Sequence, residues 1–305
     1  MREITSESTY IDPVFIVGMP RSGTTLIQGI LSNTGKYFPM PETHFFSRVA
    51  YALPENGLSD KDRKRIRRKL IRKSRIKIDE KALFNLTSQK EVFEYVLGLF
   101  NPDKKNTFLE KTPRHVFFYS KILRYYPKAK FICMVREPKN IVSSRLRRNL
   151  KQKKSVIRLS LLYNKIAAAI LDIKGKDNVM LVRYEDLTDE NEFSLKKICK
   201  FLTIPYDGQF LKNVVAPKEI VSAHEFWKNN NLALQTIREN NPDKWRTTLN
   251  MDQAHLVNYI TRLYAPKFGY STKYDWVKVC RGLARDVKRV FKVGEIKKII
   301  SQVHG

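Results

Sequence analysis

The sequence predicts a single α/β domain with three layers and a parallel central sheet. Three short apolar runs, at residues 14–17, 131–135 and 179–182, are each followed by turn residues and a helical pattern. Strand and helix signals that alternate in this way are typical of a parallel sheet covered by helices on both faces. The chain has 305 residues, of which 42% are hydrophobic, so it can bury a large core and is not a wholly disordered basic protein.

The first predicted strand, residues 14–17 (VFIV), leads into a glycine-containing loop and then a helix. In this context the backbone N–H groups of the loop and the helix N-terminus converge on an anion. Gly18 and Gly23 have the G-x-x-x-x-G spacing of a phosphate loop, which predicts a P-loop-type domain. Thr24 stands where a nucleotide triphosphatase has its lysine, which argues against a phosphate-loop kinase. Arg21, inside the loop, can bind an anion through two hydrogen bonds.

The hexapeptide PRSGTT at residues 20–25 resembles the 5′-phosphosulfate loop of sulfotransferases that use 3′-phosphoadenosine 5′-phosphosulfate (PAPS). The match is closest to the branch that contains tyrosylprotein sulfotransferases and many bacterial sulfotransferases. The resemblance covers residues 13–270, which we take as the sulfotransferase domain. It implies that five loop residues bind the 5′ end of PAPS: Arg21, Ser22, Gly23, Thr24 and Thr25.

A second phosphate site is predicted at the end of the apolar run FICMV. Arg136 follows this strand at its carboxyl end, where open α/β sheets bind ligands. Ser144 comes eight residues later and Arg148 a further four, one helical turn on, so the three side chains can clamp a phosphate monoester. In the resembled family this strand–helix unit binds the 3′-phosphate of PAPS, and the resemblance assigns that phosphate to Arg136, Ser144 and Arg148. For Arg148 the alternative is a solvated charge on the helix.

The resemblance also implies a base and a cationic catalyst. Glu42, in the segment PETH, corresponds to the family's general base, which accepts the proton of the acceptor hydroxyl. Lys111, in the segment EKTP, matches the lysine that stabilises the leaving oxygen, and Arg21 shares this task. The alternatives are a helix-capping or surface glutamate and a surface lysine. His44 and His115 lie beside these positions and are bases in principle, but the local P-E-T pattern favours Glu42.

Three further residues are assigned to the cofactor by the resemblance alone. Tyr184 follows the third predicted strand, and in the family it approaches the nucleotide end of PAPS; a buried core tyrosine is the alternative. Arg238 and Lys244 lie in the segment RENNPDKW, which resembles the loop that closes over the cofactor. Trp245, in the same segment, is interpreted as core packing.

The function that the resemblance implies is transfer of the sulfuryl group of PAPS to an acceptor hydroxyl, without a metal. A carbohydrate or glycolipid acceptor is expected, and polypeptide tyrosine is the alternative. A non-catalytic protein that binds polyanions or membranes on a degenerate P-loop fold is the alternative from another class. Three widely spaced cysteines argue against disulfides and zinc, and no signal peptide or membrane span is recognisable. A cytoplasmic protein, peripheral on the inner face of the membrane, is expected.

The net charge of +28 is concentrated in two blocks. Residues 61–77 hold eleven Lys and Arg against one Asp, and residues 273–298 hold nine against three acidic residues. Both blocks carry apolar residues at helical spacing, which suits an anionic membrane surface. In the second block these apolar residues are Trp276, Val279, Leu283, Val287 and Val290 or Phe291. The alternative is a helix whose apolar stripe packs on the domain and whose charges are solvated. For the first block a polysaccharide or nucleic acid is also considered, although no specific nucleic acid is expected.

Two segments are predicted to lie outside the central sheet. Residues 43–107 are interpreted as a mainly helical insertion that shapes the acceptor site. Residues 271–305 are interpreted as a basic amphipathic helical extension, because about 35 residues cannot bury a core of their own.

Overall fold

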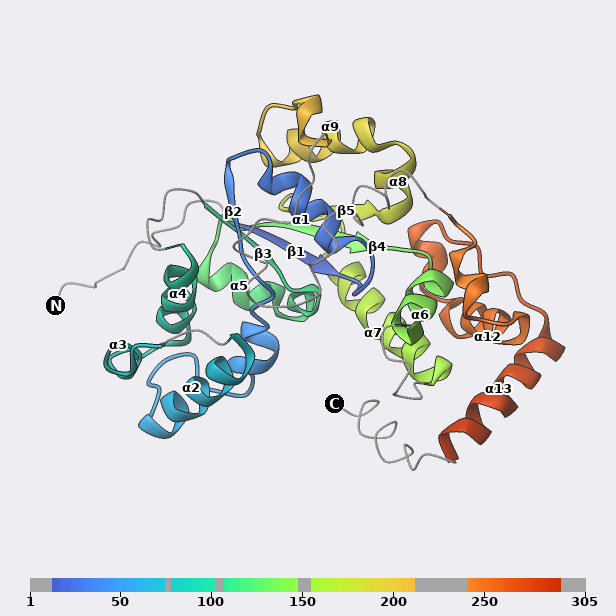
Figure 1. Cartoon of the computed structure of the whole chain (residues 1–305), viewed down its shortest axis with the longest axis horizontal. Coiled ribbons are helices and arrows are strands. Elements are labelled where there is room, and N and C mark those ends of the chain that lie inside the picture. Colours follow the sequence, from blue (N-terminus) through green and yellow to red (C-terminus); the bar gives the residue numbers. More distant parts are fainter. Residues whose placement is uncertain (1–12, 75–77, 102–106, 148–154, 212–240, 292–305) are drawn as a thin grey trace.

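Five parallel strands form the central sheet of this computed structural model, which describes residues 13–74, 78–101, 107–147, 155–211 and 241–291 (Figure 1). Their order across the sheet is β2-β3-β1-β4-β5, and every neighbouring pair is parallel. The strands are β1 (Val14–Gly18), β2 (Tyr37–Pro39), β3 (Thr107–Lys111), β4 (Lys130–Val135) and β5 (Val179–Arg183). The predicted α/β fold with a parallel central sheet is confirmed.

The sheet separates two hydrophobic layers. In β1, Phe15 and Val17 enter one cluster of buried side chains, whereas Val14 and Ile16 enter the other. All four are fully buried, as expected for a central strand covered on both faces. The edge strand β2 was not predicted, because it has only three residues and ends in Pro39, so it carries no continuous apolar run.

Two groups of helices cover the two faces of the sheet (Figure 1). The helices α1 (Thr24–Ser32) and α9 (Asn191–Leu202) pack on the face that holds Val14 and Ile16. The helix α7 (Val156–Ile173) packs on the opposite face. The shorter elements of this region are η2 (Pro113–Phe118), α5 (Tyr119–Tyr125), α6 (Pro138–Arg147), α8 (Tyr184–Asp189) and η3 (Gly208–Leu211).

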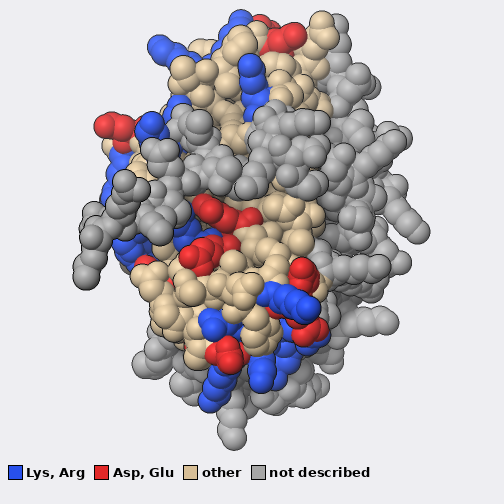
Figure 2. All heavy atoms as spheres, turned by 90° about the vertical axis from the view of Figure 1, so that its left-hand side faces the viewer, with Lys and Arg blue, Asp and Glu red and all other residues tan. Residues whose placement is uncertain are grey.

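The described part of the first basic block, residues 61–74, lies on a helix between β2 and β3. The described elements there are η1 (Phe45–Val49), α2 (Asp60–Ser74), α3 (Glu80–Phe84) and α4 (Gln89–Phe100). Helix α2 turns Ile66 and Leu70 into the core, and Lys69 Nζ donates to the carbonyls of Arg48 and Val49. On the face drawn in Figure 2, Lys and Arg lie in separate groups with Asp and Glu among them. Because Ile66 and Leu70 are buried in the core, these two apolar residues of α2 are not available to enter a membrane.

The part of the second basic block that the structure describes lies mostly on α13 (Trp276–Phe291), which packs beside α12 (Met251–Thr261). The predicted apolar stripe is divided between the domain and the surface, since Val279 is buried but Trp276 and Leu283 are 56% and 45% exposed. The short elements that accompany these helices are η5 (Lys244–Thr247) and η6 (Ala265–Phe268). Within the described ranges, none of the helices has the length and apolar composition that crossing a membrane requires.

Polar contacts determine which side of α13 packs on the domain. The carboxylate of Asp286 is buried and accepts hydrogen bonds from Ser155 Oγ at 2.5 Å, Val156 N at 3.0 Å and Ile157 N at 3.1 Å. These donors form the N-terminus of α7, where a negative charge is favourable. A Cβ at Gly282 would lie 2.6 Å from the carbonyl oxygen of Asp252, so the close approach of α13 to α12 requires glycine.

The substitution Asp286→Ala is expected to destabilise the folded chain by about 3 kcal/mol, because two buried donors and one partly buried donor lose their acceptor. Urea unfolding measures the effect. The control Arg285→Ala removes an ion pair to Asp252 whose arginine is 60% exposed, so it is expected to cost less than about 1 kcal/mol. Equal unfolding midpoints for the two variants would contradict the anchoring role of Asp286.

Candidate active site

The segments that carry the predicted site residues leave the sheet at one edge. In the parallel register Ile16 of β1 pairs with Lys111 of β3, and Gly18 of β1 pairs with Met134 of β4. Strand β5 ends beside β4 in the same register. The carboxyl ends of four strands therefore lie together, which is where ligands bind in open α/β sheets.

The phosphate loop is pressed against β4. Ser22 is fully buried, and its hydroxyl donates to the carbonyl oxygens of Met19 at 2.5 Å and Met134 at 3.2 Å. At Gly18, with a φ of 114°, a Cβ would collide with the backbone of Met134, so this approach requires glycine. The hydroxyl of Ser22 therefore holds the loop in place, and the assignment of this residue to the cofactor stays a prediction.

The two predicted phosphate sites meet in the structure. Arg21 Nε donates to Ser144 Oγ on α6 at 3.0 Å, and Arg136 Nη1 donates to the carbonyl oxygen of Arg21 at 3.3 Å. Arg21 has a φ of 76°, a conformation that persists in a residue other than glycine only where its surroundings hold it. The three polar side chains therefore form one cationic group, built from the β1 loop and the β4–α6 unit.

Tyr184 completes this group from the end of β5. The guanidinium carbon of Arg136 lies 3.8 Å from the centre of the Tyr184 ring, a favourable cation–π arrangement. Tyr184 is also buried, and a Cβ at Gly23 would lie 2.5 Å from its ring. Thr24 and Thr25 begin α1 directly after Gly23, so the N–H groups of the helix N-terminus adjoin the same loop.

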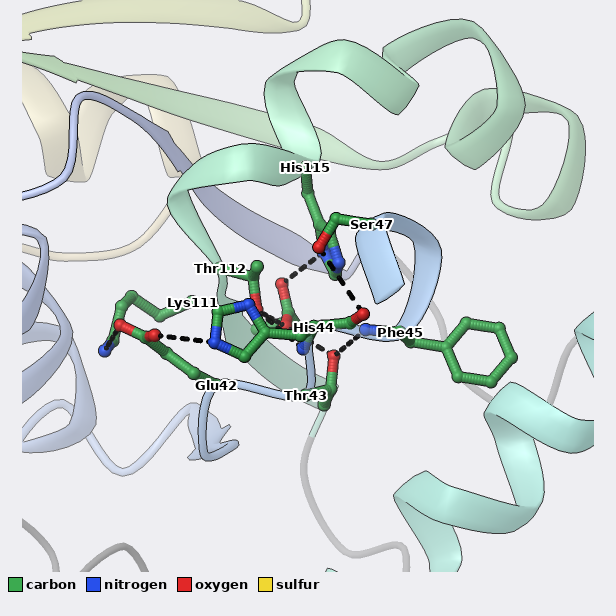
Figure 3. Close-up of polar contacts among 9 residues, drawn as sticks. Glu42, Thr43, His44, Phe45, Ser47, Lys111, Thr112 and His115 are labelled. Carbon is green, nitrogen blue, oxygen red and sulfur yellow. Dashed lines mark hydrogen bonds and ion pairs between the residues drawn. The ribbon is translucent and has the colours of Figure 1, made fainter. Parts of the chain in front are cut away.

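Glu42 and Lys111 form an ion pair, with 2.7 Å between Oε1 and Nζ, and Glu42 Oε2 lies 3.2 Å from His44 Nε2 (Figure 3). Burial by itself would raise the pKa of Glu42, but the hydrogen bonds and charges of His44 and Lys111 outweigh it and hold that pKa well below its ordinary value. Glu42 is therefore a carboxylate at neutral pH. Its side chain is 39% exposed and that of Lys111 only 6%, so the carboxylate is the accessible member of the pair.

A buried cluster next to this pair was not predicted. Glu110 is fully buried, and its carboxylate accepts hydrogen bonds from Thr43 Oγ1 at 2.8 Å and Thr112 Oγ1 at 2.5 Å. Its second oxygen lies 2.9 Å from Nδ1 of His115, which is also fully buried. Of the two histidines considered as bases, only His44 contacts Glu42. The sequence did carry a signal for the burial of Glu110. Side chains alternate along a strand, so Glu110 points into the core if Lys111, the next residue of β3, faces the site.

Of the remaining predicted residues, two lie outside the described chain and two lie on η5, which contacts α6. Arg148 and Arg238 are outside the described residues. Lys244 has an exposed side chain, and its carbonyl accepts a hydrogen bond from Arg147 Nη1 at 3.3 Å, which attaches η5 to α6. Trp245 is buried, as predicted. In the part of the chain that the structure describes, no group of three or more His, Cys, Asp or Glu side chains could hold a metal.

A family model described as "Sulfotransferase family" matches residues 13–208. The chain belongs to the sulfotransferase family. The match contains the phosphate loop, Glu42, Lys111, the β4–α6 unit and Tyr184.

Solved sulfotransferase domains share this fold. The sulfotransferase domain of the Synechococcus PCC 7002 olefin synthase has a TM-score of 0.58 and 23% identity, covering 89% of this chain and 99% of that domain. The sulfotransferase domain of the curacin biosynthetic pathway has a TM-score of 0.58 and 19% identity, covering 88% of this chain and 100% of that domain. These two similarities show a common architecture.

The curated relatives are longer proteins that match this chain over only part of their length. A protein-tyrosine sulfotransferase of Drosophila melanogaster is 26% identical over 206 residues, which cover 65% of this chain and 39% of the relative. An uncharacterised protein of Aquifex aeolicus is 22% identical over 226 residues, which cover 69% of this chain and 28% of the relative. The chain therefore spans less than half the length of these two relatives.

The substitution Gly23→Ala is expected to lower the free energy of unfolding by about 2–3 kcal/mol, because it adds a clash with the Tyr184 ring to the strain of a positive φ. The control Gly35→Ala has a positive φ as well, but its Cβ meets nothing within 4 Å, so only the strain of about 1 kcal/mol is expected. Thermal unfolding compares the two. Equal losses would show that Tyr184 does not restrict the loop.

Proposed function

We propose that this sulfotransferase transfers the sulfuryl group of PAPS to an acceptor hydroxyl. The observation that carries the proposal is the meeting, at one edge of the sheet, of the Arg21–Ser144–Arg136 group and the Glu42–Lys111 ion pair. The first group supplies cations for the two phosphate-bearing ends of one donor. The second supplies a base for the acceptor and a cation for the leaving oxygen.

The donor site follows the phosphate loop and the β4–α6 unit. The 5′ end of PAPS is assigned to the loop, with the hydroxyl of Ser22 holding it in place and Arg21, Gly23, Thr24 and Thr25 facing the donor. There the positive end of α1 and the guanidinium of Arg21 favour an anion. The 3′-phosphate is assigned to Arg136 and Ser144, with Tyr184 supporting Arg136. The assignments of Arg148, Arg238 and Lys244 remain predictions from the resemblance.

In the reaction, PAPS supplies a sulfuryl group whose bond to the phosphate oxygen breaks as the acceptor oxygen bonds to sulfur. Glu42 takes the proton of the acceptor hydroxyl while that bond forms. Lys111 and Arg21 neutralise the negative charge that develops on the leaving oxygen. His44 holds the second carboxylate oxygen and so orients Glu42.

Lys111 couples the two tasks. Its ammonium has three donors, and one of them is directed to Glu42 at 2.7 Å. When Lys111 turns toward the leaving oxygen, a contact that lowers the pKa of Glu42 weakens, while burial continues to raise it. Glu42 therefore becomes a stronger base when the donor engages the lysine.

The acceptor that we propose is a carbohydrate or glycolipid hydroxyl, presented at an anionic membrane surface in the cytoplasm. The strongly basic composition supports such a surface, and the cysteines are free, which suits a reducing compartment. Polypeptide tyrosine is a second candidate, favoured by the similarity to the Drosophila melanogaster protein-tyrosine sulfotransferase.

The outward side of α13 supports the membrane part of this proposal. Trp276, Val277 and Leu283 are 56%, 58% and 45% exposed, although the same helix is anchored to the domain by Asp286. Arg281 and Lys288 are exposed on this helix as well. Exposed tryptophan and aliphatic side chains beside lysine and arginine are typical of helices that lie in an anionic lipid interface.

The roles of Arg136 and Glu42 are separable. Arg136→Ala is expected to weaken binding of 3′-phosphoadenosine 5′-phosphate (PAP) by about 10- to 100-fold, because charge-assisted hydrogen bonds are lost. Glu42→Gln is expected to bind PAP as the unmodified chain does and to slow transfer by about 100-fold or more. Calorimetry measures the binding of PAP, and the transfer of radiolabelled sulfate to glycans, glycolipids and tyrosine peptides measures the reaction rate. If both variants lost PAP affinity equally, the division of roles would be wrong, and an unmodified chain that bound no PAP would contradict the proposal.

Replacing both Trp276 and Leu283 by Ser is expected to reduce co-sedimentation with phosphatidylserine-containing vesicles by about fivefold or more, because apolar area is lost from the interface. Phe193→Ser on α9 is the control, since this aromatic side chain is 55% exposed but lies on another helix. Unchanged co-sedimentation of the double variant would rule out α13 as the membrane-binding element.

A further inference from the structure

Glu110 joins the two segments that carry the proposed catalytic pair. It precedes Lys111 in β3, and successive side chains of a strand point to opposite faces, so Glu110 faces the core while Lys111 meets Glu42. On the core side its carboxylate accepts a 2.8 Å hydrogen bond from Thr43, the residue after Glu42. One buried carboxylate is thus bonded directly to a neighbour of Glu42 and adjoins Lys111 in the chain.

The same cluster holds the backbone that follows Glu42 (Figure 3). Thr112 Oγ1 donates to Glu110 and accepts a hydrogen bond from His44 N at 3.3 Å. Thr43 Oγ1 donates to Glu110 and accepts one from Phe45 N at 3.2 Å. His44 has a φ of 50°, and the π-helical turn η1 follows it directly. Both conformations are uncommon and persist where other contacts support them.

The carboxylate of Glu110 is charged, although it is fully buried. Burial would raise its pKa, but His115, Thr112 and Thr43 together hold the pKa below its ordinary value. A buried charge of this kind is stable only with its donors in place, so the loss of one donor is costly. The donors, and the segments that carry them, are therefore held in one arrangement.

We propose that Glu110 is a positioning residue of the transfer reaction, and that its bonds fix Glu42 relative to Lys111. The proposal rests on the roles proposed above for those two side chains. Glu110 has no exposed surface, so it acts through Thr43 and Thr112 and not on a substrate. A misplacement of about 1 Å at a catalytic group costs up to about 100-fold in rate. The hydrogen bonds that join Arg21, Ser144 and Arg136 include no residue of this cluster.

The test compares Glu110→Gln, Thr43→Val and their double variant. Each single change is expected to lower kcat by about 10- to 100-fold, with the Kd for PAP within about twofold of the unmodified chain. Thr43→Ser keeps the hydroxyl and is expected to restore kcat to within about threefold. The double variant is expected to be no slower than the slower single variant, because both changes remove the same link.

Asp286→Asn is the matched control, because it makes the same chemical change at a buried carboxylate with three donors on α7. It is expected to lower stability and leave kcat unchanged. The positioning role is overturned if Glu110→Gln keeps kcat within about twofold of the unmodified chain, or if its kcat and its PAP affinity fall together. It is also overturned if the effects of the two single changes multiply in the double variant. A loss of kcat in Asp286→Asn as large as that in Glu110→Gln overturns it as well.

A second readout does not require transfer. Carbon-13 NMR of labelled glutamate measures the pKa of Glu42, which is expected below its ordinary value in the unmodified chain. In Glu110→Gln it is expected to rise, because Lys111 and His44 are no longer aligned with the carboxylate. An unchanged pKa overturns the positioning role. A chain that transfers no sulfate and yet shows this rise contradicts the proposed function alone.

Discussion

The site depends on the contact between the phosphate loop and β4. Gly18 and the buried hydroxyl of Ser22 press the loop against the backbone of Met134, and Arg136 donates to the carbonyl of Arg21. Two guanidinium groups from separate βα units are thereby held at one edge of the sheet. Like charges held close together repel one another, and an anion between them relieves that repulsion. The backbone contact therefore favours an anionic ligand at this edge of the sheet.

Much of this arrangement could be predicted, because parallel strands bring their carboxyl ends to one edge whatever the tertiary detail. An apolar run followed by a polar motif was enough to predict an anion site at Arg21 and another at Arg136 and Ser144. The resemblance to PAPS-dependent sulfotransferases assigned both sites to one ligand, and the structure brings the three residues into contact. The pairing of Glu42 with Lys111 was available only through resemblance, since nothing local in either segment points to the other. The 2.7 Å ion pair shows that the two segments do meet.

What could not be predicted depends on partners distant in the sequence. Helical periodicity gave the second basic block an apolar stripe, but the side of α13 that packs carries Gly282 and Asp286. Two contacts decide the orientation of this helix. Asp286 bonds to Ser155 at the N-terminus of α7, 131 residues away in the sequence, and Gly282 allows the close approach to α12. Glu110 likewise appears in the sequence as a charged residue at a strand end. Its burial depends on Thr43, which only the fold brings within reach.

Three carboxylates show how surroundings decide a chemical role. Glu110 and Asp286 have almost no exposed surface, and their partners are hydroxyl and backbone groups together with the buried His115 beside Glu110. Such carboxylates are fixed by their donors, and they hold structure in place. Glu42 is 39% exposed, and its two partners are a lysine and a histidine. In the reaction that we propose, Lys111 exchanges Glu42 for the leaving oxygen, and the basicity of Glu42 rises as a result. Of the three carboxylates, Glu42 is the one whose exposure and partners suit the proposed role of base.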